Sequence, residues 1–372
     1  MKIGVPREVK NREYRVGMTP AAVHELCSHG HEVCVETNAG AAIGFSDDDY
    51  REAGAQILET AREVFEAAGM IVKVKEPQPE ERAMLTSGHT LFTYLHLAPD
   101  KAQTDDLVKS GATCIAYETV TDQSGHLPLL APMSEVAGRM SIQAGAHCLE
   151  KALGGRGVLL GGVPGVSPAK VTVVGGGVVG QNAAVMAIGM GAHVTVLDRS
   201  MEVLRNLDHL YGNRITTLFS TAQTLDQSVT ESDLVIGSVL IPGASAPKLI
   251  TRDMIRRMPE GSVIVDVAID QGGCTETSKP TTHDEPTYIV DGVVHYCVAN
   301  MPGAVARTST LALNNVTLPF VAALANKGPV RAMKEDPHLL AGLNVFAGKV
   351  TYREVAEATG HPYTNPESLM GS

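Results

Sequence analysis

A glycine-rich segment carries the strongest chemical signal in this sequence. Residues 170–184 read KVTVVGGGVVGQNAA, in which Gly175, Gly177 and Gly180 form Gly-x-Gly-x-x-Gly between a β-favouring run and an apolar helix-like run. In such a unit the first glycine permits the tight turn, the second lets the backbone approach a pyrophosphate, and the third lets helix and strand pack closely. The helix N-terminus that follows offers N–H groups to the phosphates. The segment therefore predicts a dinucleotide-binding turn.

An acidic residue lies at the end of the strand that follows the glycine-rich turn, as is usual in dinucleotide-binding units. The next strand-like segment, HVTVLD, ends at Asp198. A carboxylate there accepts hydrogen bonds from the adenosine ribose hydroxyls and repels a 2′-phosphate. We therefore expect NAD rather than NADP, a preference that the neighbouring Arg199 softens. The alternative, a glycine turn that binds nothing, is disfavoured because strand, helix and acid are in register.

Four further polar residues fall near the ends of expected strands. Strand 71–75 ends at Lys75, LFTYLHL carries His96 near its end, and VIVDVAID ends at Asp270. The first strand leads into a loop that holds Arg15. Because open α/β sheets bind ligands beyond the carboxyl ends of their strands, we expect these groups to face one cleft between two domains.

The types of these residues suggest one reaction. A guanidinium binds a carboxylate with two parallel hydrogen bonds, an ammonium adds a further donor, and an imidazole moves protons near neutral pH. With NAD, this set indicates hydride transfer at a carbon that bears a carboxylate. Each residue alone also has a structural interpretation: a solvated arginine, a lysine extending from a strand end, a satisfied histidine, and an aspartate that caps the turn after residue 270.

The elements that position these residues alternate between strand and helix along most of the chain. This alternation predicts an α/β fold with two Rossmann-like domains and mostly parallel sheets. Two long helical stretches, near residues 132–153 and within TLALNNVTLPFVAALANKG, interrupt it, and the tail beyond reads as helical. We expect a cofactor domain over 130–306, inserted into a discontinuous substrate domain of 1–129 and 307–372, with a hinge at the two helices.

Composition narrows the class of protein. The chain has 372 residues, a formal net charge of −11 and no basic tract, so a nucleic-acid partner is not expected. We see no apolar run of membrane-spanning length and no signal-peptide core, and six cysteines without C-x-x-C suggest reduced thiols in the cytoplasm. The cluster HELCSHGHEVC invites a zinc interpretation, but a helix and a strand would separate its ligands, and we expect no metal site.

Long stretches of the sequence match one known family. They are MKIGVPREVKNREYRVGMTP, VKVKEPQP, LFTYLHLAPD, LLAPMSEVAGRMSIQAGAHCLE, VTVVGGGVVGQNAA, VDVAIDQGGC, PTTHDEPTY and VHYCVANMPGAV. In these stretches, almost from end to end, the chain resembles the NAD-dependent L-alanine dehydrogenases. The resemblance implies a homohexamer that converts L-alanine reversibly to pyruvate and ammonia, with no membrane partner.

The resemblance also implies roles for individual residues. Arg15 and Lys75 would bind the substrate carboxylate and oxygen, His96 would be the acid/base, and Asp270 would be the second catalytic residue. Asp198 would hold the adenosine ribose, and Ser220 would lie by the adenine. The full set of implied cofactor contacts is Ser134, Gly175, Gly177, Val178, Gly180, Asp198, Ser220, Val239, Leu240, Val267, Ala268, Ile269, Asp270, Lys279, Val298, Ala299, Asn300 and Met301.

The sequence departs from the family at three positions, and it leaves three rival functions open. Ala306 replaces a proline, Val203 stands where the family often has a basic residue, and Lys279 stands where it often has arginine. The nearest rival is the nucleotide-binding arm of a proton-pumping transhydrogenase, which docks to another subunit instead of binding an amino acid. A saccharopine-type dehydrogenase and a catalytically silent NAD-sensing module are the others. The combination of Lys75, His96 and Asp270 favours the alanine dehydrogenase interpretation.

Overall fold

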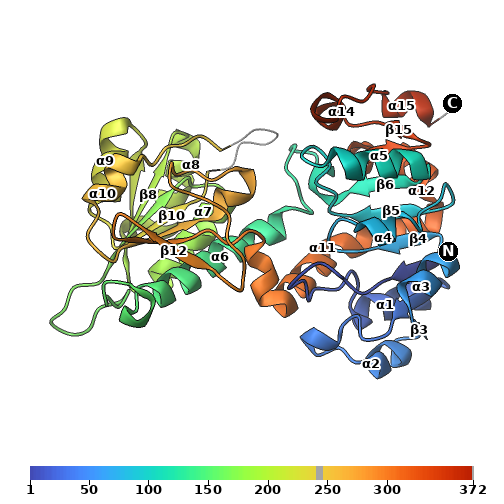
Figure 1. Cartoon of the computed structure of the whole chain (residues 1–372), viewed down its shortest axis with the longest axis horizontal. Helices are drawn as coiled ribbons and strands as arrows, with labels where there is room; N and C mark the ends of the chain where they lie inside the picture. The colour runs from blue at the N-terminus through green and yellow to red at the C-terminus, as the bar shows by residue number, and fades with distance from the viewer. Residues whose placement is uncertain (240–245, 371–372) are drawn as a thin grey trace. The chain divides into compact units, whose positions relative to one another are not determined.

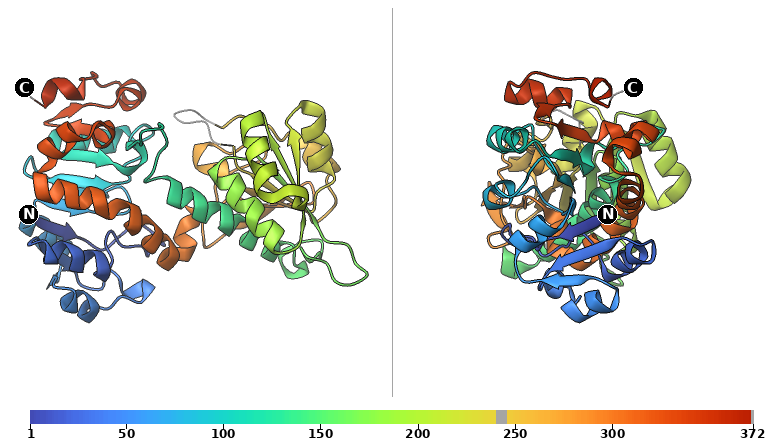
Figure 2. Two further views of the ribbon diagram at one scale, coloured as in Figure 1. Left: turned by 180° about the vertical axis from the view of Figure 1, so that it is seen from behind. Right: turned by 90° about the vertical axis from the view of Figure 1, so that its right-hand side faces the viewer.

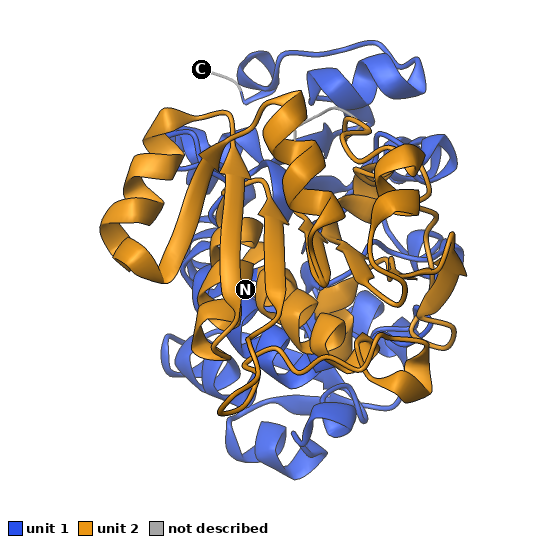
Figure 3. Ribbon diagram, turned by 90° about the vertical axis from the view of Figure 1, so that its left-hand side faces the viewer, with its two compact units in different colours: residues 1–132, 305–372 blue, residues 133–304 orange. Residues whose placement is uncertain are grey.

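The computed structural model describes residues 1–239 and 246–370 (Figure 1). The chain divides into two compact units (Figure 3): unit 1 is Met1–Pro132 with Val305–Ser372, and unit 2 is Met133–Ala304. The domain limits expected from the sequence lie within a few residues of these bounds. The assignment of substrate binding to one unit and cofactor binding to the other stays a prediction.

Unit 1 is built on one mixed sheet. Among the described residues its strand order is β15-β14-β6-β5-β4-β1-β2-β3, so the first six strands have the doubly wound order 3-2-1-4-5-6. These six are parallel, whereas β14 runs antiparallel to β6 and to β15. The strands are β1 (Lys2–Val5), β2 (Glu32–Glu36), β3 (Gln56–Leu58), β4 (Met70–Val72), β5 (Thr90–Thr93), β6 (Thr113–Ala116), β14 (Leu343–Phe346) and β15 (Lys349–Val350).

Helices cover both faces of this sheet. In Figure 1, α5 lies in front of the sheet, and Figure 2 shows α11 and α12 on its other face. The Thr19 side chain caps α1 by accepting a hydrogen bond from the Ala22 amide, and Pro20 begins the helix. The helices are α1 (Pro20–Ser28), α2 (Asp47–Glu52), α3 (Ala61–Ala67), α4 (Pro79–Arg82), α5 (Lys101–Ser110), α11 (Ala306–Lys327), α12 (Pro329–Glu335), α13 (Pro337–Ala341), α14 (Arg353–Thr359) and α15 (Pro366–Leu369).

Unit 2 repeats the doubly wound order. Its described strands lie in the order β12-β13-β11-β10-β7-β8-β9, and β12 alone among them is antiparallel to its neighbour. Two apolar clusters pack this unit, and they use different strand residues and different helices. One contains Val173 and Ala183, and the other contains Leu197 and Val229. The elements are α6 (Ala131–Cys148), β7 (Lys170–Val174), α7 (Val178–Gly189), β8 (His193–Asp198), α8 (Met201–Tyr211), β9 (Ile215–Phe219), α9 (Ala222–Thr230), β10 (Leu234–Gly237), α10 (Arg252–Arg257), β11 (Val263–Asp266), β12 (Thr287–Val290) and β13 (Val293–Tyr296). The α/β class with two mostly parallel sheets is thus confirmed.

The prediction of a wholly helical tail is wrong. β14 and β15 form a hairpin whose two-residue turn consists of Ala347, with φ 48°, and Gly348, with φ 77°. Positive φ at both positions is the backbone that joins tightly paired antiparallel strands. The run LNVF is too short for periodicity to separate strand from helix, and its pairing with β6 makes it a strand.

One helical stretch is longer and more apolar than we expected. Met301–Lys327 meets the length and composition of a membrane span, although no such run was expected. Its helix α11 buries Ser309, Thr310 and Asn314, and the Asn314 carboxamide oxygen accepts hydrogen bonds from the Thr19 amide and hydroxyl. These polar contacts tie α11 to the start of α1, as in a core helix. Ala306 is the first residue of α11, where proline is favoured.

Candidate active site

The glycine turn of unit 2 fits an approaching diphosphate. Gly175 has φ +100°, a conformation that side chains disfavour. A Cβ on Gly180 would lie 1.8 Å from the Gly175 carbonyl oxygen, so only glycine allows α7 to pack this closely. A Cβ on Gly177 would meet no atom of the described residues within 4 Å, its chain neighbours apart. Because Gly177 is the N-cap of α7, this open space lies before the N-terminal amides of the helix, where Val178 is exposed.

Asp198 lies directly beside this turn. Its Oδ2 accepts a hydrogen bond from the Gly176 amide at 2.7 Å, and its Oδ1 accepts one from the Ser200 amide at 2.8 Å. The Ser220 amide donates to the Asp198 carbonyl at 2.9 Å, so the two predicted adenosine contacts are neighbours. The Val203 side chain also packs at the turn, 2.7 Å from where a Cβ of Gly176 would stand.

Two more predicted contacts lie around the turn. Val239 follows β10, and its Cγ2 lies 3.2 Å from the position of a Cβ on Gly175. A Cβ on Gly138 in α6 would lie 2.2 Å from the Val179 carbonyl, so α6 packs closely on the first turn of α7. Ser134 stands one helical turn before Gly138 on the same face of α6. Leu240 lies outside the described residues.

Asp270 lies on a 3₁₀ helix and not at a strand end. β11 ends at Asp266, so the strand expected to reach Asp270 is too long. The buried Asp266 caps the 3₁₀ helix Val267–Gln271 through the Ala268 amide, and its other oxygen accepts from the Cys274 amide. Asp270 is exposed on this helix. The carboxylate of Asp266 thus shapes the segment that holds the predicted contacts 267–270.

The remaining cofactor predictions fall on the segments around β13. The Lys279 ammonium lies 4.5 Å from the centre of the Tyr288 ring, a cation–π contact. Val298 and Met301 are buried, while Ala299 is half-buried. Asn300 has φ +67°, and its carbonyl is 3.2 Å from Nε2 of His283. A left-handed asparagine next to the buried Met301 marks a constrained backbone of the kind found at functional sites.

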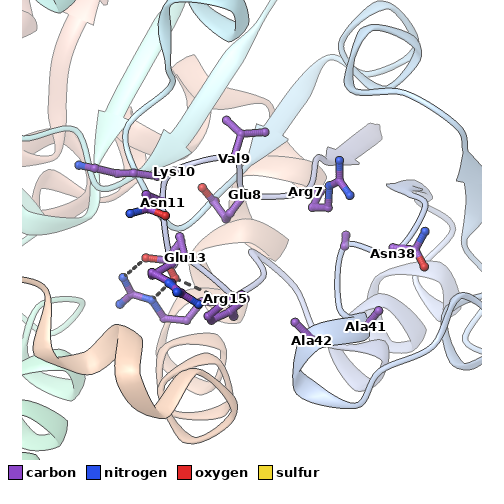
Figure 4. Close-up of a pocket in the computed structure, with 13 residues that line it drawn as sticks. Arg7, Glu8, Val9, Lys10, Asn11, Glu13, Arg15, Asn38, Ala41 and Ala42 are labelled. Carbon is purple, nitrogen blue, oxygen red and sulfur yellow. Dashed lines mark hydrogen bonds and ion pairs between the residues drawn. The ribbon is translucent and has the colours of Figure 1, made fainter. Parts of the chain in front are cut away.

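In unit 1, Arg15 is buried in an ion pair. Its Nε and Nη2 donate to the two carboxylate oxygens of Glu13 at 2.7 and 2.6 Å, and its side chain is 2% exposed. Burial opposes the guanidinium charge, but the hydrogen bonds and charge of Glu13 outweigh it and raise the pKa of Arg15. The pair borders a pocket of about 570 Å³ (Figure 4). The pocket is also lined by Arg7, Glu8, Val9, Lys10, Asn11, Arg12, Tyr14, Asn38, Ala39, Ala41 and Ala42.

Lys75 and His96 lie beyond the strands that were expected to carry them. β4 ends at Val72 and β5 ends at Thr93, so both residues stand in the loops that follow. The Lys75 carbonyl accepts a hydrogen bond from the Thr93 hydroxyl at 3.0 Å, which holds one loop to the other strand. Both loops leave the carboxyl edge of the sheet, where β4 adjoins β1 at the point of reversed strand order.

His96 has a constrained backbone. Its φ is +50°, and the Glu118 carboxylate accepts its amide hydrogen at 2.6 Å. Glu118 Oε1 lies 4.0 Å from His96 Nδ1, and the Tyr94 ring stacks on the imidazole at 5.9 Å between centres. Burial raises the pKa of Tyr94 well above its usual range, so this hydroxyl stays protonated. The imidazole itself is 46% exposed and can reach a ligand.

Sequence reasoning missed three partners of these residues. They are Glu13, Tyr94 and Glu118. Glu118 follows β6, so the rule that led to His96 could have found it. Glu13 precedes Arg15 by two residues, but spacing in a loop does not show that the two side chains pair.

These arrangements define the class of protein. Each unit is a doubly wound α/β domain, and the predicted residues lie at the carboxyl edges of both sheets, one of which has the glycine turn of dinucleotide-binding oxidoreductases. Family models described as alanine dehydrogenase/PNT, N-terminal domain and C-terminal domain match residues 4–137 and 141–353. The chain belongs to the alanine dehydrogenase/PNT family.

Individual relatives agree with this assignment. An alanine dehydrogenase of Halomonas elongata is 64% identical over 371 residues, which is 100% of both chains. A solved L-alanine dehydrogenase is 51% identical with a TM-score of 0.94, covering 97% of this chain and 99% of that one. A transhydrogenase from Sinorhizobium meliloti is 25% identical with a TM-score of 0.81, over 95% of this chain and 99% of that one. The similarity therefore favours an alanine dehydrogenase oxidoreductase over the transhydrogenase arm.

Proposed function

We propose that this protein catalyses the reversible, NAD-dependent oxidative deamination of L-alanine to pyruvate and ammonia. The observation that carries the proposal is the 64% identity to an alanine dehydrogenase over the full length of both chains. The open space beside Gly177, which a side chain would enter, supports a dinucleotide as the cofactor of unit 2. The buried Arg15 and the exposed imidazole of His96 support an amino acid as the substrate of unit 1.

The cofactor would be held by the turn and by Asp198. The backbone amides after Gly177 would bind the diphosphate, and Asp198 would accept hydrogen bonds from the ribose. The other proposed contacts, including Ser134, Ser220, Lys279 and the segments at 267–270 and 298–301, would complete the site. When bound, NAD supplies the hydride acceptor at its nicotinamide ring.

The chain's own residues would bind the substrate and move protons. Arg15, whose plane Glu13 fixes, and Lys75 would hold the carboxylate of alanine. Alanine would react with its amine neutral, and loss of the Cα hydrogen as hydride leaves an iminium ion, whose positive charge Asp270 would stabilise. His96 would take a proton from the water that attacks this carbon and return it to the departing nitrogen. Alanine, water and NAD⁺ thus become pyruvate, ammonia, NADH and one proton.

We further propose a cytoplasmic homohexamer. The six cysteines are free thiols, as expected for a reducing compartment. Sedimentation of the purified protein would test the oligomeric state, and a monomer at micromolar concentration would contradict this part of the proposal.

Substituting Asp198 tests the choice of cofactor. In Asp198→Ala we expect weaker NAD binding and a smaller preference for NAD over NADP, because the carboxylate that repels a 2′-phosphate is lost. The measurement is kcat/KM with each cofactor at saturating alanine. Asp208→Ala, at an exposed acid in α8, is the matched control and should leave the ratio unchanged. An unaltered ratio in Asp198→Ala would remove Asp198 from the ribose site.

A substrate panel tests the reaction itself. We expect alanine to give the fastest NADH formation among amino acids supplied with NAD⁺, and pyruvate with ammonia to reverse the reaction. A transhydrogenase arm or a silent NAD-binding module would form no NADH, and a saccharopine-type enzyme would require its larger substrate. Absence of turnover with alanine would reject the proposal.

A further inference from the structure

Three charged side chains are buried together in unit 1, outside the proposed catalytic set. Lys73 Nζ lies 3.1 Å from Oε2 of Glu8 and 2.6 Å from Oε1 of Glu81, and the side chains of all three are at most 4% exposed. They come from the loop after β1, the position directly after β4 and helix α4. Burial opposes the Lys73 charge, but the two carboxylates outweigh it and raise the pKa of this lysine, which therefore stays charged.

The carboxylates of this cluster also bind the backbone of the Lys75 loop. Glu8 Oε1 accepts hydrogen bonds from the amides of Val74 at 2.7 Å and of Lys75 at 3.3 Å. Glu81 Oε2 accepts from the Gln78 amide at 2.7 Å. The cluster thus holds the loop at both ends.

Sheet pairing explains why the loop needs these acceptors. β4 pairs with β1 only at Met70 and Ile71, so later amides on that side have left the ladder. On the other side the loop still follows β5, because the Val74 carbonyl accepts from the Tyr94 amide at 3.2 Å. The Glu8 carboxylate therefore accepts the hydrogen bonds of amides that no longer pair with the backbone of β1.

Stability alone does not account for the cluster. Burial raises the pKa of the Glu8 carboxyl and so disfavours its charge, and well-packed apolar residues often serve stability as well as a buried ion pair does. Apolar residues at these positions would not fix the backbone conformation of the Lys75 loop.

We propose that Glu8, Lys73 and Glu81 are positioning residues that hold the Lys75 loop in its substrate-binding conformation. The inference rests on the proposed function, in which Lys75 binds the substrate carboxylate. Glu8 supplies the acceptor oxygen, and Lys73 fixes the Glu8 and Glu81 carboxylates relative to each other. Glu8 also lines the pocket that Arg15 borders (Figure 4). The loop that carries Glu8 therefore serves both of the proposed carboxylate-binding cations.

Two matched triple variants test the acceptor directly. Glu8→Gln/Lys73→Met/Glu81→Gln removes all three charges but keeps oxygen acceptors for the loop, whereas Glu8→Ala/Lys73→Met/Glu81→Gln differs only in lacking the acceptor at position 8. We expect KM for alanine and for pyruvate to rise about tenfold in the second variant relative to the first. We expect kcat to change less, and the Kd for NADH to be equal in the two. Equal KM values in two folded triples would overturn the inference.

A control and a second measurement separate this result from other failures. His89→Ala removes a buried side chain at the amino end of β5, where it bonds to the Phe65 carbonyl, and should lower stability without raising KM. Hydrogen exchange in the wild-type protein should show protected amides at Val74 and Lys75, and fast exchange there would overturn the inference even if neither triple folds. Wild-type protein that does not oxidise alanine would reject the proposed function instead.

Discussion

Replacing His96 with alanine should lower the turnover of alanine about 100- to 10,000-fold, the usual contribution of a general acid–base group. The imidazole stands on a left-handed backbone that Glu118 holds through the amide, and its ring is 46% exposed. Such a strained and accessible histidine is typical of a group kept for chemistry. NADH binding should persist, because the glycine turn belongs to unit 2. Steady-state kinetics and an NADH fluorescence titration would measure the two effects.

The matched control for this prediction is His126→Ala. His126 is 79% exposed and lies beside Asp122, outside the proposed site. It should leave both turnover and NADH binding unchanged. Full turnover in His96→Ala would remove His96 from the mechanism, and a joint loss of turnover and NADH binding would indicate a structural role instead.

Replacing Gly177 with alanine should weaken NADH binding about 10- to 100-fold while the protein stays folded. The φ of Gly177 is −68°, which alanine adopts without strain, and the new Cβ would meet no described atom within 4 Å beyond its chain neighbours. The methyl group would instead occupy the space in which we propose that the diphosphate meets the helix amides. Losing one or two hydrogen bonds to a charged group, at about 1.5–3 kcal/mol each, accounts for this loss of affinity.

Two other glycines of the same helix complete the experiment. Gly189→Ala also adds a Cβ with no described atom within 4 Å beyond its chain neighbours and its own helix backbone, but at the far end of α7, and should leave NADH binding unchanged and slightly raise stability. Gly180→Ala should unfold the turn, because its Cβ would lie 1.8 Å from a carbonyl oxygen. Thermal unfolding and NADH titration of all three separate packing from binding. Wild-type affinity in Gly177→Ala would place the diphosphate elsewhere.

The amino-acid sequence by itself determined the local features of this protein. The three glycines, the strand before them and Asp198 at the end of the next strand are contiguous or nearly so, and each acts through backbone geometry that its own residue type dictates. The caps at Thr19 and Ser46 are local for the same reason, since each side chain bonds an amide three residues away. Periodicity over long segments likewise predicted two mostly parallel α/β sheets.

Only the tertiary structure decided where the strands stop and what holds the loops beyond them. Lys75 and His96 lie past the ends of their strands, where carboxylates replace the backbone acceptors of the sheet. Glu8 binds the Val74 amide, 66 residues away, and Glu118 binds the His96 amide, 22 residues away. The tail hairpin forms because β14 pairs with β6, which lies at one end of the six parallel strands and is far away in the chain. Hydrogen bonds of this kind join residues that no short window contains together. The partners in these hydrogen bonds depend on which segments the packed core brings side by side, and not on residue type.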